Sequence, residues 1–210
     1  MSVAGIILAA GESRRMGFPK ALLRYRDETF LDTLIGLFDA RCQPVIVVLG
    51  AQSDLIREHT LRAASFVINA DYQRGQTSSM QCGLRAVPPG AEGVLFTLVD
   101  HPAVAPATLD ALLRGRSSGS VPMTGDAAGL SASATSYRAR VPRYQGRRGH
   151  PIWFARELIA EFLGLPDNGA AREIVRGHSS HTEFLDVDDP GILADIDDPA
   201  AYGRLTGALL

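Results

Sequence analysis

Residues 8–20 read Leu8-Ala9-Ala10-Gly11-Glu12-Ser13-Arg14-Arg15-Met16-Gly17-Phe18-Pro19-Lys20, and they follow directly on the apolar run Val3 to Leu8. A run of aliphatic and β-branched residues that ends in small residues and then a glycine is typical of a buried parallel strand opening into a loop at its carboxyl end. In open α/β sheets, this is the edge at which ligands bind. The stretch therefore predicts an α/β fold whose ligand site begins where the first strand ends.

The composition of this loop suits a polyphosphate ligand. Arg14, Arg15 and Lys20 supply three cations against the single acid Glu12, and the loop glycines let the backbone turn tightly and approach a ligand without a Cβ clash. The two familiar phosphate-loop motifs, G-x-x-x-x-G-K-[ST] and G-x-G-x-x-G, do not fit here. From these residues alone a purely steric turn is an equal alternative, because surface turns are often rich in glycine.

The loop and three later stretches resemble one known family. Leu8-Ala9-Ala10-Gly11, Ser13, Arg15-Met16-Gly17 and Lys20 resemble the L-A-A-G-x-S-x-R-M-G-x-x-K signature of the Rossmann-like nucleotidyltransferases, in the branch that transfers a nucleotide to the molybdenum cofactor. The later stretches are Gly75-Gln76 with Ser79, then Leu98-Val99-Asp100-His101-Pro102, then Gln145-Gly146-Arg147-Arg148-Gly149-His150-Pro151. The resemblance spans the chain and implies a three-layer Rossmann-like nucleotidyltransferase fold, of class α/β, with a mostly parallel central sheet.

Composition limits the classes of partner. The chain has 210 residues, 46% of them hydrophobic and 21% charged, and we expect a single nucleotidyltransferase domain over residues 1–210. A net charge of -2 favours neither nucleic acid nor a membrane as partner, so any cationic site must be local. Two cysteines, Cys42 and Cys82, are too few for a disulfide framework or a cysteine zinc site. Without a basic leader or a run approaching the ~20 apolar residues of a membrane span, we expect a cytoplasmic protein.

Apolar runs and helical periodicity alternate along the first half of the chain. Strands are predicted over 44–49, 66–69 and 93–99, and a helix over 29–38 with Thr29 as its N-cap. This alternation predicts a parallel sheet with right-handed crossovers. Residues 115–136 are small and polar with little periodicity, which predicts a flexible loop. Further helices are predicted over 53–62, 106–113 (with Thr108 facing outward), 155–163 and 170–175, and a strand over 183–187.

A second polar loop runs from Asn69 to Ser79, before a helix. Thr77 or Ser78 can cap that helix, which explains the loop without any ligand. Alternatively, the free amides of the helix start and the Gln76 side chain hydrogen-bond the edge of a base. The family resemblance favours base recognition. It implies nucleotide binding by Leu8, Ala9, Ala10, Gly11, Ser13, Gly75, Gln76 and Ser79.

Carboxylates occur in two remote stretches. Asp100 follows the most strand-like run, where it would face the same sheet edge as the first loop and could hold Mg²⁺, although Asp before His-Pro also commonly starts a turn. Asp195-Ile196-Asp197-Asp198-Pro199 resembles the family's D-I-D-T-P motif with Asp198 in the threonine position, while helix caps and turns are the alternative. The resemblance implies Mg²⁺ bound by Asp100 and Asp197, with Asp195 the other candidate for second ligand.

Arginines alternate with aromatic residues over 137–153. Such a pattern can bind single-stranded nucleic acid, but the patch is short and the chain is net acidic. A solvated strand face and a pocket for a planar, phosphorylated second substrate are the alternatives. The resemblance implies that Arg147, Arg148 and His150 bind the pterin phosphate of that substrate or organise the site.

Taken together, the resemblance implies a Mg²⁺-dependent enzyme that transfers CMP from CTP to the phosphate of the molybdenum-pterin cofactor and releases pyrophosphate. Arg15, Lys20 and Asp100 would be the catalytic residues. An alanine-bearing L-A-A-G loop goes with CTP in the family, whereas a second glycine there goes with GTP. A GTP-using enzyme, a sugar-phosphate nucleotidyltransferase and a non-catalytic cofactor carrier are the alternatives. Expected partners are CTP, a molybdopterin-type substrate, and a molybdoenzyme or its maturation chaperone that receives the product.

Overall fold

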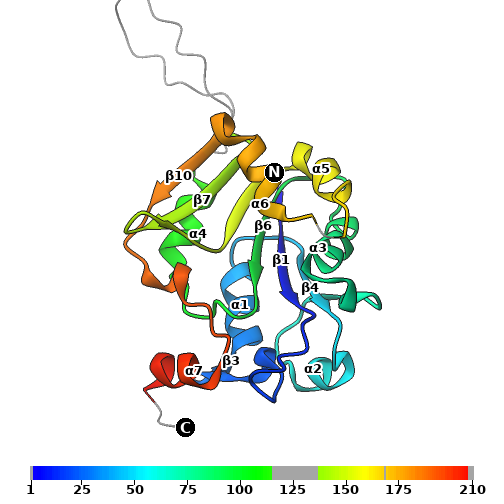
Figure 1. The fold of residues 1–210 in the computed structure, drawn as a ribbon, viewed down its shortest axis with the longest axis vertical. Coiled ribbons are helices and arrows are strands. Elements are labelled where there is room, and N and C mark those ends of the chain that lie inside the picture. Colours follow the sequence, from blue (N-terminus) through cyan, green and yellow to red (C-terminus); the bar gives the residue numbers. More distant parts are fainter. Residues whose placement is uncertain (1, 115–136, 168, 208–210) are drawn as a thin grey trace, which may run out of the picture.

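A computed structural model describes residues 2–114, 137–167 and 169–207. The flexible loop predicted over 115–136 lies outside these residues. The centre of the fold is an eight-stranded sheet in the order β10-β7-β9-β6-β1-β4-β5, with β8 paired to β7 (Figure 1). Its strands are β1 (Ser2–Ala9), β4 (Val45–Leu49), β5 (Ser65–Ile68), β6 (Ala91–Leu98), β7 (Ala139–Tyr144), β8 (Arg147–Arg148), β9 (Ile152–Ala155) and β10 (Thr182–Asp186).

Most neighbouring strands in this sheet run parallel. β1 pairs in parallel with both β4 and β6, β4 with β5, and β7 with β10, whereas β9 runs antiparallel between β6 and β7. The predicted α/β fold with a mostly parallel sheet is confirmed. Because β1, β4 and β6 point the same way, the loops that follow them gather at one edge of the sheet.

Helices cover both faces of the sheet, so the central strands β1 and β4 are buried on both sides (Figure 1). Ile7 of β1 packs in the core beneath α1 (Phe30–Asp39) and α4 (Pro106–Leu113), while its neighbour Ile6 packs on the other face beneath α3 (Gln76–Arg85). This alternation follows from the two-residue period of a strand. The other helices are α2 (Ser53–His59), α5 (Ile159–Leu163), α6 (Ala171–Gly177) and α7 (Pro199–Thr206), and none of the described helices has the length and hydropathy needed to cross a membrane.

Local capping matches one prediction and corrects two others. Thr29 caps α1 as predicted, since its hydroxyl oxygen accepts from the Asp32 amide at 3.0 Å. The predicted cap of α3 is wrong: Gly75, at φ 111°, occupies the N-cap position, so Thr77 falls inside the helix and donates to the Gly169 carbonyl at 2.6 Å. Thr108 does not face solvent either, because it is buried and donates to Asp189 at 2.6 Å.

Residues 189–197, here called the C-terminal strap, run from the Asp189 contact to the end of β6. Asp189 also accepts from the Ala105 amide at 2.9 Å, and the Ile196 amide donates to the Asp100 carbonyl at 3.0 Å. Ile192 and Ile196 are buried, and a Cβ at Gly191 would overlap the carbonyl of Ala103. The strap is therefore held against the same sheet edge as the first loop.

Candidate active site

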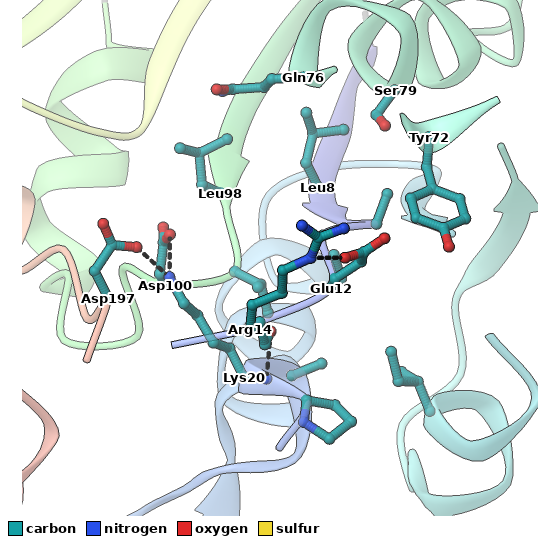
Figure 2. Close-up of a pocket in the computed structure, with 18 of the residues that line it drawn as sticks. Leu8, Glu12, Arg14, Lys20, Tyr72, Gln76, Ser79, Leu98, Asp100 and Asp197 are labelled. Atoms are coloured by element: carbon teal, nitrogen blue, oxygen red, sulfur yellow. Dashed lines mark hydrogen bonds and ion pairs between the residues drawn. The ribbon is translucent and has the colours of Figure 1, made fainter. Parts of the chain in front are cut away.

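A cavity of about 680 Å³ opens at the carboxyl ends of β1 and β6. Its walls come from the first loop, the start of α3, the end of β6 and the strap (Figure 2). All residues predicted to bind the nucleotide, to act in catalysis or, as Asp100 and Asp197, to bind Mg²⁺ line this cavity. They are Leu8, Ala9, Ala10, Gly11, Ser13, Arg15, Lys20, Gly75, Gln76, Ser79, Asp100 and Asp197.

Two residues of the first loop have backbone conformations in the left-handed region, Ser13 at φ 55° and Gly17 at φ 66°. The Ser13 hydroxyl accepts from the Lys20 amide at 3.0 Å, so the loop curls back on itself. Gly11 serves a different purpose: a Cβ there would meet no atom within 4 Å, so the fold itself does not require glycine. The absence of a side chain leaves space in the cavity wall, so a ligand can approach the backbone closely.

Lys20 is the only lysine in the chain. Its ammonium lies 3.2 Å from Asp100 Oδ2 and also donates to Asp197, and Figure 2 shows it pointing between the two carboxylates. Arg15 Nη2 reaches Asp197 Oδ2 at 2.5 Å. The Lys20 side chain is only 12% exposed, so this cation acts where water screens it less than at the surface.

Three carboxylates gather around Lys20. Asp100, Asp195 and Asp197 each offer an oxygen, and these atoms lie within 4.8 Å of one another. Burial and then the charges of Asp100 and Asp197 raise the pKa of Asp195. Burial also favours a raised pKa for Asp100, but the hydrogen bond and charge of His101, with the charge of Lys20, outweigh it and lower that pKa to about 2. Crowded oxygen ligands with mutual repulsion fit a divalent cation such as Mg²⁺ or Mn²⁺.

Asp198 stands where the D-I-D-T-P motif has threonine, and its role in the structure is a helix cap. Asp198 is the N-cap of α7 and accepts from the Ala201 amide at 2.7 Å. Threonine and aspartate both cap helices in this way. Asp198 therefore acts as a helix cap, a role that threonine can also fill.

Some lining residues carry no signal in the sequence. Tyr72 lines the far end of the cavity, close against Gly50, where a Cβ would lie 2.6 Å from the Tyr72 Cβ. Glu12 and Arg14, both named above as charges of the first loop, form an ion pair at the cavity (Figure 2). The glycine that closes β4 was the one available hint that another side chain packs closely there.

A second cavity of about 630 Å³ adjoins the first and shares Gln76 and Leu98 with it. Of the residues predicted to bind the acceptor, Arg148 and His150 line this cavity, whereas Arg147 is exposed and lines neither. The Arg148 guanidinium lies 4.2 Å from the centre of the Phe184 ring.

His150 connects the two cavities through a chain of side chains. Its ring lies 5.0 Å from that of His101, and His101 Nδ1 lies 2.8 Å from Asp100 Oδ1. Burial, with a smaller effect from His101, lowers the pKa of His150 to about 4. Its buried Nδ1 has no hydrogen-bond partner among the described residues, which is uncommon for a buried polar atom.

The family model for the MobA-like NTP transferase domain matches residues 5–183. The chain belongs to this family. A relative in Opitutus terrae, named a probable molybdenum cofactor guanylyltransferase, is 32% identical over 65% of this chain and 66% of its own length. The molybdenum cofactor cytidylyltransferase of Escherichia coli is 24% identical over 92% of this chain and 90% of its own.

A solved structure has the same fold along nearly the whole chain. Rv0371c of Mycobacterium tuberculosis superposes with a TM-score of 0.80 and 30% identity, covering 99% of this chain and 98% of that one. A structure described as its complex with manganese gives a TM-score of 0.73 at 27% identity, with 100% of each chain covered. Nucleotidyltransferase chemistry is thus the activity of the family to which this fold belongs.

Proposed function

We propose that this protein transfers CMP from CTP to the phosphate of molybdopterin, with Mg²⁺ and with release of pyrophosphate. One observation carries the proposal: Lys20, Asp100 and Asp197, from three remote parts of the chain, meet in a cavity walled by the glycine-rich loop. Cations beside an open backbone loop suit a triphosphate, and the neighbouring carboxylates suit its metal.

The chemistry asks the protein to neutralise and align two anions. Lys20 and Arg15 would hold the charge of the triphosphate and of the departing pyrophosphate, while amides around Gly11 and Ser13 cradle it. An oxygen of the acceptor phosphate bonds to the α-phosphorus as the bond to the β-phosphate oxygen breaks, and pyrophosphate leaves with that electron pair. Mg²⁺ held by Asp100 and Asp197, with Asp195 adjacent, would supply additional positive charge for the phosphates. No protein nucleophile is needed.

The choice of CTP rests on Ala10, which stands where the GTP-using branch has a second glycine. Ala10 lines the nucleotide cavity and is 5% exposed. The names of the relatives favour GTP, because most of those compared, the Opitutus terrae protein among them, are named guanylyltransferases, whereas the Escherichia coli protein is named a cytidylyltransferase. GTP is therefore the second candidate nucleotide.

Calorimetric titration of CTP, GTP, ATP and UTP, each with and without Mg²⁺, tests the nucleotide and the metal together. We expect CTP with Mg²⁺ to bind at least tenfold more tightly than GTP, and Asp197→Asn to remove most of the gain due to Mg²⁺. Tighter binding of GTP would overturn the choice of CTP. Pyrophosphate release with molybdopterin, compared with a panel of sugar phosphates, tests the acceptor, and nucleotide binding without turnover on any of them would indicate a carrier.

A further inference from the structure

We propose that Arg172 and Arg176 of α6 bind the phosphate monoester of the acceptor in the second cavity. This inference rests on the proposed function for the acceptor's identity, but its physical argument concerns the cavity alone. No motif in the sequence drew attention to either arginine. Both side chains line the second cavity, as does Val175 between them.

Arg172 and Arg176 are exposed, and unlike several other arginines of the chain they have no carboxylate partner among the described residues. Arg74, Arg140 and Arg143 each form an ion pair with an Asp or Glu. Among the described residues, neither Arg172 nor Arg176 forms an ion pair, a side-chain hydrogen bond or a ring contact. Their positive charge is therefore not neutralised within the described structure.

Helix geometry and a tertiary contact place both arginines beside the cavity. Residues four apart lie on the same face of a helix, so Arg172 and Arg176 project together. The start of α6 is tied to α3, because Thr77 donates to the Gly169 carbonyl at 2.6 Å. Gln76, the residue before Thr77, lines both cavities. The start of α6 is thereby held beside the start of α3, which lies between the two cavities.

The rest of the second cavity defines what kind of anion would enter it. Phe96, Val141 and Ile152 of the sheet supply an apolar wall, and Arg148 supplies a third cation. Its volume of about 630 Å³ lies within the range of small-ligand sites. An apolar wall opposite cations suits a flat heterocycle that carries a phosphate, and Arg is well suited to phosphate because its planar donors bind two oxygens at once. A sugar phosphate would leave the apolar wall uncovered.

Fluorescence titration with two probes, 6-hydroxymethylpterin phosphate and unphosphorylated 6-hydroxymethylpterin, tests the assignment on the full-length protein. We expect the double variant Arg172→Gln/Arg176→Gln to raise the Kd of the phosphorylated probe at least tenfold and that of the unphosphorylated probe less than twofold. Arg85→Gln is the matched control, since this exposed arginine ends α3 and lines neither cavity. The control should change neither Kd, and the melting temperatures should agree among the three proteins.

Two results would overturn the inference. One is a change of less than threefold in the Kd of the phosphorylated probe, which would make the arginines ordinary solvated side chains. The other is equal weakening of both probes, which would place the arginines on the heterocycle. With molybdopterin as substrate, the double variant should raise KM for the acceptor and leave the Kd of CTP within twofold. Because probe binding requires no transfer, arginine-dependent binding without CMP transfer would refute the proposed function and leave this inference standing.

Discussion

Replacing Lys20 by methionine removes the cation that joins the two carboxylate segments of the nucleotide cavity. Lys20 lies 3.2 Å from Asp100 Oδ2 and contacts Asp197, and its side chain is 12% exposed. An exposed ion pair would be worth about 0–1 kcal/mol. In the proposed mechanism this largely buried cation would meet developing phosphate charge, as an oxyanion-hole donor does, and loss of such a donor costs about 3–4 kcal/mol in the transition state. We therefore expect kcat/KM to fall between about 10² and 10³-fold.

The assay is steady-state release of pyrophosphate with CTP, Mg²⁺ and molybdopterin. Lys20→Arg keeps the charge but changes the donor geometry, so partial activity is expected from it. Circular dichroism melting separates loss of activity from loss of fold. A kcat/KM for Lys20→Met within threefold of the unmodified protein would remove Lys20 from the mechanism.

The uniqueness of this lysine allows a direct measurement of its surroundings. Reductive methylation with ¹³C-formaldehyde labels one side chain, Lys20, together with the amino terminus. The dimethyl-lysine resonance should shift when CTP and Mg²⁺ bind to the labelled protein. A resonance that stays unchanged under saturating nucleotide would contradict the placement of the triphosphate beside Lys20.

Three further predictions concern glycines and a histidine. Gly11→Ala should change the melting temperature by no more than about 2 °C, since the added Cβ meets no atom within 4 Å. The same change should weaken CTP binding about tenfold, because the methyl group fills space in the cavity wall. Unaltered CTP affinity in calorimetry would contradict a close approach of the ligand to this backbone. Gly149→Ala should lower the free energy of unfolding in urea by about 1–3 kcal/mol, because its Cβ would overlap the Ile192 carbonyl. Gly90→Ala, which has open space around its Cβ, should not lower it. Equal stability of the two variants would refute the packing argument. The lowered pKa of His150, about 4 against 6.5, means that the unfolded chain binds the proton more readily, so the free energy of unfolding should fall by up to about 3 kcal/mol as pH drops from 6.5 to 4. His150→Gln should flatten that part of the stability profile, and a slope that persists unchanged assigns the effect to other groups.

The sheet and the first loop were predictable because their signals are local. The apolar run from Val3 to Leu8 and the loop after it specify a strand and its ligand-binding end without reference to any other part of the chain. Two local predictions failed where the deciding partner is remote or the backbone unusual. Thr108 is buried because Asp189 accepts its hydrogen, and α3 starts at Gln76 because Gly75 adopts a positive φ.

The candidate site was only partly accessible to sequence reasoning. The meeting of Lys20 and Asp197, 177 residues apart, follows from the path of the strap and was expected through family resemblance rather than from spacing. Tyr72 and the arginines of α6 belong to no recognisable motif, so only the three-dimensional arrangement shows that they line cavities. Arg147 illustrates the converse, since a residue in a suggestive motif is exposed and lines neither cavity.

The C-terminal strap contributes Asp197 to the first cavity and contacts the backbone of His150, which lines the second, so it would couple the two proposed substrate sites. Its Ile192 carbonyl accepts from the His150 amide at 3.0 Å, while its Ile196 amide donates to the Asp100 carbonyl at 3.0 Å. An acceptor that displaced the strap at Ile192 would also change the position of Asp197, five residues later. If the acceptor changes the affinity for the nucleotide by some factor, thermodynamic linkage requires that the nucleotide changes the affinity for the acceptor by the same factor. Cooperative loading of the two substrates is thus a direct expectation from a single stretch of irregular chain.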